Sequence, residues 1–248
     1  MTLPGLIAKY EKKVLANQAK AFYSEFSQAF TAAIAKNGDP GSWVQSKYQS
    51  ASVADDRAKL IFNELKGQSC FVSYGAGGWI GYDNTKSQTC KTIERYVKNL
   101  DPNKSGFSQY YINNFGGIRN EIILPSGAIV FANNHADVNS NKSDYAVSGI
   151  SVDVNGTKGP NQIGKDIHFF VIVYRYGKIS SGRCFGHNLD YAVCWDKNRN
   201  FKTTSAIYPS GYNYELWSSS CTQKDPRDEH CTAKLVKDGW EFKDDYPW

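Results

Sequence analysis

The sequence has 248 residues, enough for one large domain or two small ones and for a buried core. Its net charge is +5, from 29 basic and 24 acidic residues, and no basic run is longer than Lys12-Lys13. Nucleic-acid binding needs a concentrated basic surface, so the charge pattern argues against a nucleic-acid partner. Aromatic residues make up 14% and there are 21 glycines, which favours strands, turns and aromatic packing over a helical bundle.

The first 36 residues predict one long amphipathic helix. Apolar residues recur there at intervals of three or four, the spacing of one helix face. The stripe consists of Leu3, Leu6, Ile7, Tyr10, Val14, Leu15, Phe22, Phe26, Ala29, Phe30 and Ala33. Asn37-Gly38-Asp39-Pro40 is a stop signal, and from Leu6 to Lys36 the helix would measure roughly 45 Å.

Three shorter helices are predicted further along the chain. Residues 52–66 begin with Ser52, a capping residue, and carry apolar residues at helical spacing. Residues 91–99 and 231–237 are also predicted to be helical, and the second of these is followed by Asp238-Gly239. Apart from residues 91–99, the stretch from residue 70 to residue 115 is predicted to form loops.

The strands are predicted to begin near residue 121. Two short apolar runs, residues 121–124 and 128–132, flank Pro125-Ser126-Gly127 and predict a hairpin. Residues 145–154 predict a third strand. Residues 166–176 are apolar on both faces, so this strand should lie between a helix and another covering layer. The elements together predict an α+β fold with the long helix packed on an antiparallel β-sheet.

Six cysteines fall into three pairs that are close in sequence. The pairs are Cys70 with Cys90, Cys184 with Cys194, and Cys221 with Cys231. None forms Cys-x-x-Cys and no histidine has zinc-finger spacing, so disulfides are favoured over a metal site. Proximity is the only basis for this pairing, since six cysteines allow 15 connectivities. Disulfides imply an oxidising compartment.

The loop at residues 153–166 is the candidate metal site. Asp153, Asn155, Asn161 and Asp166 offer four oxygen-bearing side chains, and its glycines permit tight turns, as a calcium loop requires. Its start, Asp-x-Asn-Gly, resembles an EF-hand loop, but the acid at the twelfth position is missing. In the alternative interpretation, the same side chains cap turns by accepting hydrogen bonds from nearby backbone.

An aromatic cluster is the candidate ligand- or surface-binding site. Its central residues are Tyr74, Trp79 and Tyr82, and Phe107, Tyr110, Tyr111 and Phe115 extend it. The alternative is a satellite core beneath long loops.

No catalytic residues are predicted. The histidines are His135, His168, His187 and His230, and no Gly-x-Ser-x-Gly accompanies them. The disulfides leave no thiol nucleophile. The sequence therefore predicts a protein that is not an enzyme and has no cofactor, calcium excepted.

Three segments resemble bacterial type IV pilin-like and type II secretion pseudopilin-like proteins. The opening residues 2–10, running into residues 22–30, resemble the stretch just after the hydrophobic helix of such proteins. Residues 153–166, followed by an aromatic-rich strand, resemble one of their loops. Residues 231–240, with the ending 245–248, are similar to their carboxy-terminal signature. The resemblance is thin between residues 68 and 120.

The resemblance implies a single pilin-like domain over residues 1–248. Residues 1–36 would be the carboxy-terminal half of the long pilin helix and 68–120 an insertion. Residues 121–176 would form the sheet and 177–248 a disulfide-rich region. The implied function is a structural subunit, a minor pilin or pseudopilin of a type IV pilus or type II secretion pseudopilus. The alternative is an adhesive or ligand-binding minor pilin at the filament tip that uses residues 68–120.

The family's leader, the hydrophobic half of its first helix and its early glutamate are missing here, which suggests that Met1 is an artificial start. The implied native protein lies in the inner membrane before assembly and then in a periplasmic or extracellular filament, whereas this fragment should be soluble. The implied partners are other pilin or pseudopilin subunits, the inner-membrane assembly platform and a prepilin peptidase. The resemblance leaves open which machine the filament belongs to.

Overall fold

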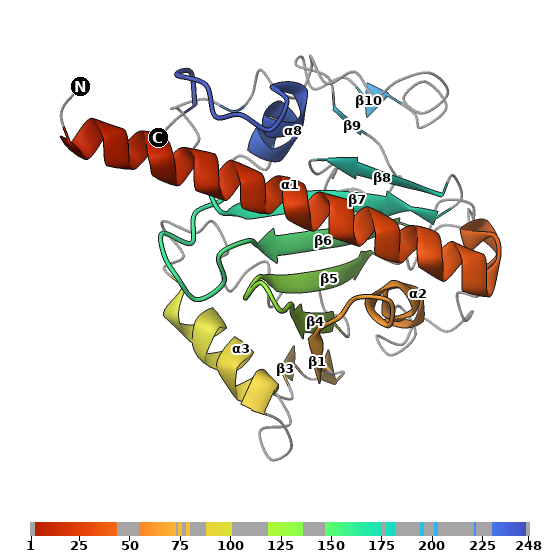
Figure 1. Cartoon of the computed structure of the whole chain (residues 1–248). Helices are drawn as coiled ribbons and strands as arrows, with labels where there is room; N and C mark the ends of the chain where they lie inside the picture. The colour runs from red at the N-terminus through yellow and green to blue at the C-terminus, as the bar shows by residue number, and fades with distance from the viewer. Residues whose placement is uncertain are drawn as a thin grey trace.

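The computed structural model describes residues 3–43, 55–72, 74–75, 78–79, 88–100, 119–135, 147–174, 177–181, 194–195, 201–202, 221 and 230–246. They form an α+β structure in which a long helix crosses one face of a six-stranded antiparallel sheet (Figure 1). The predicted combination of a long amino-terminal helix and an antiparallel sheet is confirmed.

The long helix α1 spans Leu3–Asn37. It ends where the stop signal predicts, because Gly38 adopts a left-handed φ of 76° and its amide donates to the Ile34 carbonyl at 2.8 Å. A short 3₁₀ helix, η1 (Pro40–Ser42), follows. Among the described residues, no helix is long and apolar enough to span a membrane.

The shorter helices are α2 (Asp55–Phe62), α3 (Gln88–Asn99) and α8 (His230–Lys237). Each overlaps a predicted helix. α2 ends earlier than predicted, and its predicted cap Ser52 lies outside the described residues. α3 begins three residues earlier than predicted. α8 ends at Asp238-Gly239 as expected, with Gly239 at a left-handed φ of 73°.

The main sheet has the strand order β1-β4-β5-β6-β7-β8, and every neighbouring pair is antiparallel. Its strands are β1 (Gln68–Val72), β4 (Arg119–Ile123), β5 (Ile129–His135), β6 (Val147–Asp153), β7 (Ile167–Val173) and β8 (Lys178–Ser181). The predicted hairpin is β4–β5, closed by the Leu124 amide donating to the Ala128 carbonyl at 2.9 Å. Two small pairs stand apart: β2 (Tyr74–Gly75) with β3 (Gly78–Trp79), and β9 (Cys194–Trp195) with β10 (Phe201–Lys202).

The sheet extends beyond the predicted residues 121–176 at both ends. β1 lies in the stretch predicted to be loops, yet it pairs along its length with β4. β8 adds the opposite edge strand beside β7. β1 begins with polar residues and shows no clear alternation, so its strand conformation depends on pairing with a partner about fifty residues away, which local sequence does not reveal.

The sheet is covered on both faces, as the doubly apolar strand predicts. Phe170 and Ile172 of β7 belong to the core beneath α1, whereas Ile167 and Phe169 belong to a second core that includes α3. Successive side chains of a strand point to opposite faces, so β7 contributes to both cores. This explains its continuous run of apolar residues.

Small and aromatic residues alternate along the buried side of α1. Ala19, Ala29 and Ala33 are buried and allow the helix to lie close to the sheet. The Phe22 ring contacts Phe170 of β7, with centroids 5.7 Å apart. Further along the helix, the rings of Phe30, Trp43 and Tyr174 form a continuous series.

The apolar stripe of α1 winds around the helix instead of following one face. Residues four apart are offset by 40° in an α-helix, so five such steps from Leu6 to Phe26 rotate the stripe by about 200°. Phe26 is fully buried against the sheet, whereas Leu6 is 55% exposed on the part of α1 that extends beyond the sheet (Figure 1). The two ends of the stripe therefore face different surroundings.

Replacing apolar residues at the two ends of the stripe should have unequal effects. Phe26→Ala should lower the free energy of unfolding by about 3–5 kcal/mol, because it opens a cavity between α1 and the sheet. Leu6→Ala should change it by less than about 0.5 kcal/mol. Urea unfolding followed by tryptophan fluorescence measures both, and equal losses would contradict the assignment of the two ends.

Candidate functional site

The free end of α1 is the first candidate site. Leu3, Leu6, Ile7 and Tyr10 are 71%, 55%, 50% and 68% exposed. They lie at intervals of three, one and three residues, so they share one side of the helix. Nothing else in the described chain exposes large apolar side chains to this extent.

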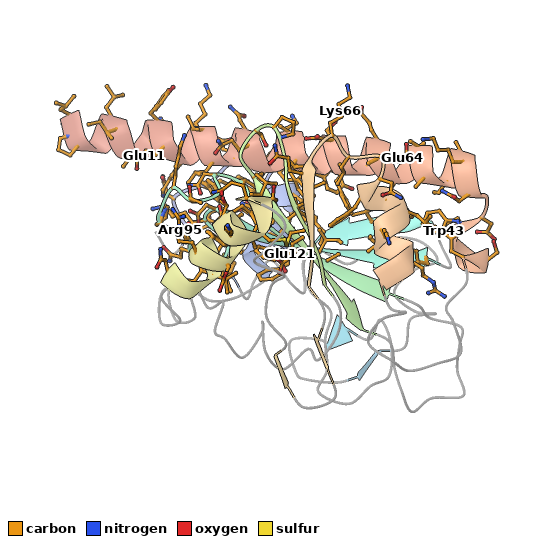
Figure 2. The ribbon with its side chains drawn as sticks, turned by 90° about the horizontal axis from the view of Figure 1, so that it is seen from below. Glu11, Trp43, Glu64, Lys66, Arg95 and Glu121 are labelled. Atoms are coloured by element: carbon orange, nitrogen blue, oxygen red, sulfur yellow. A yellow bond between two sulfur atoms is a disulfide. The ribbon has the colours of Figure 1, made fainter. Side chains whose placement is uncertain are left out.

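Three lysines lie on the same part of α1 as this apolar patch. Lys9, Lys12 and Lys13 belong to the same turns of α1, and none has a hydrogen-bond or ion-pair partner among the described residues. Figure 2 shows side chains along α1 that point away from the sheet, with Glu11 on the same free portion. A long exposed apolar patch of this kind is typical of an interaction surface.

The loop at residues 153–166 is the second candidate site, and it does bring the four predicted calcium ligands together. Asp153 Oδ1 accepts hydrogen bonds from the amides of Asn155 and Gly156 at 3.2 and 2.9 Å. The Asp166 carboxylate accepts from the amides of Asn161 and Gln162 at 2.8 and 2.6 Å. Both carboxylates therefore organise turns through nearby backbone, which is the alternative that the sequence left open.

The side chains of Asn155 and Asn161 form hydrogen bonds within the same loop. In the orientation that satisfies its hydrogen bonds, the Asn161 amide donates to the carbonyls of Lys158 and Gly156 and to Asp153 Oδ2, at 3.0, 3.2 and 3.1 Å. Asn155 Nδ2 donates to the Gly159 carbonyl at 3.1 Å. Asn155 Oδ1 is buried and has no hydrogen-bond partner among the described residues. Asn155 Oδ1 would supply one oxygen ligand, whereas a calcium ion takes six to eight.

The glycine in the EF-hand-like start of the loop has a packing role. Gly156 has a left-handed φ of 66°, and a Cβ built on it would collide with the carbonyl oxygen of Gly127 in the β4–β5 turn. A residue with a side chain would therefore be strained here for two reasons, the left-handed backbone and the collision with Gly127. The contact with the hairpin accounts for the glycine of the Asp-x-Asn-Gly pattern.

A tyrosine of α3 ties the helix to this loop. The Tyr96 hydroxyl donates to Asp153 Oδ2 at 2.6 Å, and both residues are buried. Burial raises the pKa of Asp153 well above its usual value, and the nearby negative charge of Asp166 raises it further. Burial also raises the pKa of Tyr96 and of Asp166. No local pattern in the sequence points to a role for Tyr96, because its partner lies 57 residues away.

Two disulfides join described residues, and both are pairs that proximity predicts. Cys70 of β1 is joined to Cys90 of α3, and Cys221 is joined to Cys231 of α8. The pairing of Cys184 lies outside the described residues. The first disulfide fixes α3 to an edge strand of the sheet, so α3 is held beside the loop at residues 153–166.

The predicted aromatic site is only partly described. Tyr74 and Trp79 are cross-strand neighbours in the β2–β3 pair. Tyr82 lies outside the described residues, as do Phe107, Tyr110, Tyr111 and Phe115. Ligand binding by these aromatic residues stays a prediction.

Two polar residues of the sheet are fully buried, and the sequence predicted a packed or edge position for one of them, His168. Glu121 of β4 is fully buried on the α3 side of the sheet, where its cross-strand neighbours are Cys70 and Phe131. His168 of β7 is fully buried next to Thr232 of α8, with His168 Nδ1 and the Thr232 hydroxyl oxygen 3.4 Å apart. The side chains of His135, His187 and His230 lie outside the described part of the structure.

The carboxy-terminal segment is held by a compact ion-pair cluster. Lys234 of α8 pairs with Asp238 at 2.7 Å and with Asp245 at 2.9 Å, and Lys243 pairs with Asp238 at 2.8 Å. The Lys234 ammonium also lies 4.5 Å from the centre of the Tyr246 ring. Burial raises the pKa of Asp238, but the hydrogen bonds from the two lysines outweigh it and hold that pKa below its usual value. The cluster gives the segment from Lys234 to Tyr246 a structural role.

The burial of His168 predicts a loss of stability in acid. Burial lowers its pKa from 6.5 to about 4, so the unfolded chain takes up a proton at a higher pH than the folded chain does. The stability that the folded protein gains from keeping His168 neutral is fully present above pH 6.5 and is lost as the pH falls through 4. The loss amounts to about 3 kcal/mol. Urea unfolding measures the free energy of unfolding at pH 7 and at pH 4. Its decrease between the two pH values should be smaller by this amount in His168→Leu than in the wild type.

The comparison with His168→Leu is necessary because two buried acids change the stability of the protein with pH in the opposite direction. The raised pKa values of Asp153 and Asp166 add stability as the pH falls. They are the same in both proteins and cancel in the difference. Identical pH dependence in the two proteins would refute the assignment of His168 as a buried neutral group.

Calcium binding at Asp153, Asn155, Asn161 and Asp166 can be decided by calorimetry. Among the described residues, no three His, Cys, Asp or Glu side chains are grouped to hold a metal. Since the loop's carboxylates already accept backbone hydrogen bonds, we expect no heat from titration to about 1 mM calcium, within the range of extracellular calcium modules. Saturable heat that disappears in Asp166→Asn would establish the calcium interpretation instead.

Comparison with known proteins assigns a family without a known function. No curated protein and no solved structure matches the chain. A family model described as a family of unknown function (DUF6613) matches residues 5–146. The match covers more than half of the chain, from α1 to just before β6, and includes the segment 68–120. The chain therefore belongs to the family of unknown function DUF6613.

Proposed function

We propose that this protein is a structural, non-catalytic subunit of a pilin-like filament, a minor pilin or pseudopilin that assembles through helix α1. The observation that carries the proposal is the apolar patch on the free end of α1, formed by Leu3, Leu6, Ile7 and Tyr10. A helix that is bound to its own sheet at one end and exposes apolar residues at the other is suited to packing against helices of neighbouring subunits.

The direction of the patch supports assembly through α1. The winding stripe places Leu6 and Tyr10 roughly opposite the side on which Phe26 contacts the sheet. A partner helix can therefore approach the free end without displacing the globular part. The disulfides Cys70–Cys90 and Cys221–Cys231 support an extracytoplasmic location, because such bonds persist in oxidising compartments.

The sequence resemblance supports the pilin-like class of filament. The segments that carry it include α1, the loop at residues 153–166 and α8 with its ion-pair cluster. In this proposal the native chain is anchored in the inner membrane by a preceding apolar helix, is processed by a prepilin peptidase and meets an assembly platform. Whether the filament is a pilus or a secretion pseudopilus is left open.

Charged residues in the patch should block assembly without unfolding the protein. In the native full-length protein, expressed in its own host, the double variant L6E/I7E should reduce the amount in the sheared filament fraction at least about tenfold, because it places two carboxylates in an apolar helix contact. Asn17→Glu, an exposed substitution on the same helix, should leave the amount unchanged.

The unfolding free energy of the isolated L6E/I7E chain should stay within about 0.5 kcal/mol of the wild type, since both residues are exposed. Release of the wild-type protein as a monomer, with no filament fraction, would refute the proposal. So would equal filament yields from the wild type and L6E/I7E.

A further inference from the structure

We infer that a pocket between α3 and the loop at residues 153–166 binds a small hydroxylated carboxylate, the chemistry of an acidic sugar residue. The pocket has a volume of about 260 Å³. It is lined by Thr92, Arg95, Tyr96, Asn99, Thr157 and Asn161. This inference goes beyond the filament proposal and does not depend on it.

Arg95 supplies the positive charge in the pocket. It is the one charged side chain of the lining, it is exposed, and it has no hydrogen-bond or ion-pair partner among the described residues. Figure 2 shows it on α3, away from Glu121 in the sheet. A guanidinium binds a carboxylate through two parallel hydrogen bonds, so the pocket has an anchor for one anionic group.

The other lining groups suit hydroxyls. Asn99 and Thr157 are exposed and have no hydrogen-bond partner within the described part of the chain, so both can donate and accept. The Thr92 hydroxyl donates to the Gln88 carbonyl at 3.0 Å, which leaves its oxygen free to accept. A ring of neutral polar groups around one cation matches a molecule with several hydroxyls and one carboxylate.

The walls of the pocket are fixed before any ligand arrives. The Tyr96 hydroxyl is held by Asp153, and the Asn161 backbone amide is held by Asp166. The Cys70–Cys90 disulfide anchors α3 to β1 at the start of the helix. Because Tyr96 and the backbone at Asn161 are already ordered, the loss of freedom on binding is confined to the exposed side chains of the lining, Arg95 among them.

The size of the pocket limits the ligand to one sugar-sized unit. Pockets for drug-sized ligands begin at roughly 300 Å³, slightly more than this volume. The pocket is also open at the surface, where Arg95, Asn99 and Thr157 are exposed. A terminal residue of a longer acidic glycan could therefore enter while the remainder of the glycan stays outside.

Calorimetric or NMR titration of the isolated chain with glucuronate tests the inference. We expect saturable binding of glucuronate with a Kd on the order of 1 mM. Binding of glucose should be at least about tenfold weaker, because loss of the ion pair with Arg95 costs about a factor of ten in affinity. Arg95→Gln should weaken glucuronate binding at least about tenfold. Lys91→Gln removes the same charge one helical turn away, outside the pocket, and should change Kd less than about twofold.

Three outcomes would overturn the inference. One is the absence of saturable glucuronate binding up to about 20 mM, a concentration well above the expected Kd. Another is equal affinity of Arg95→Gln and wild type. The third is inorganic phosphate binding as tightly as glucuronate, which would indicate a simple anion site. Since the titration uses the unassembled chain, none of these outcomes bears on filament assembly.

Discussion

Burial of the apolar side of α1 on the sheet is the contact on which the other elements depend. Phe22, Phe26 and Phe30 of the helix occupy the same core as Phe170, Ile172 and Tyr174, which come from β7 and the residue that follows it. Trp43 after the helix and Leu235 of α8 join this core. Without α1 the inner face of the sheet would expose its apolar residues to water, and Trp43 and Leu235 would lose part of the core in which they are buried.

The opposite face of the sheet is closed by a smaller core, and its organisation differs. There α3 contributes Ile93 and Tyr96 and is attached through the Cys70–Cys90 disulfide. Polar residues take part as well, because the Tyr96–Asp153 hydrogen bond joins the helix to the loop at residues 153–166. One loop therefore serves three elements: it caps its own turns, contacts the β4–β5 hairpin at Gly156 and positions α3. The pocket at Arg95 is a consequence of this junction.

The proposed roles of the molecule use regions that the main core leaves free. The free end of α1 is apolar, extends beyond the sheet and is suited to a partner helix. The pocket is polar, carries one cation and lies on the side of the sheet away from α1. A filament subunit with a separate small-molecule site would hold the two activities apart, so assembly and binding could be altered independently.

Local patterns in the sequence were sufficient for the helices and for most of the sheet. α1 and its end at Gly38 follow from the spacing of apolar residues and from a stop signal, and the β4–β5 hairpin follows from two apolar runs around Pro125-Ser126-Gly127. The two covered faces follow from the continuous apolar run in β7. The closeness of Asp153, Asn155, Asn161 and Asp166 follows from their position in one short loop.

Contacts between distant residues were decided only by the tertiary structure. β1 is a strand because β4 pairs with it, and no local pattern could show that partner. The stripe of α1 is exposed only where the helix extends beyond the sheet, so the sequence could predict the stripe but not which part of it is exposed. The sequence left both calcium binding and turn capping open for the loop's oxygen atoms, and the tertiary structure shows Asp153 and Asp166 accepting hydrogen bonds from backbone amides. By itself the sequence determined the helices and the central strands. Packing determined that β1 and β8 join the sheet, which polar groups are buried, which apolar groups remain exposed and where Arg95 meets the loop, because burial depends on neighbours that are remote in the chain.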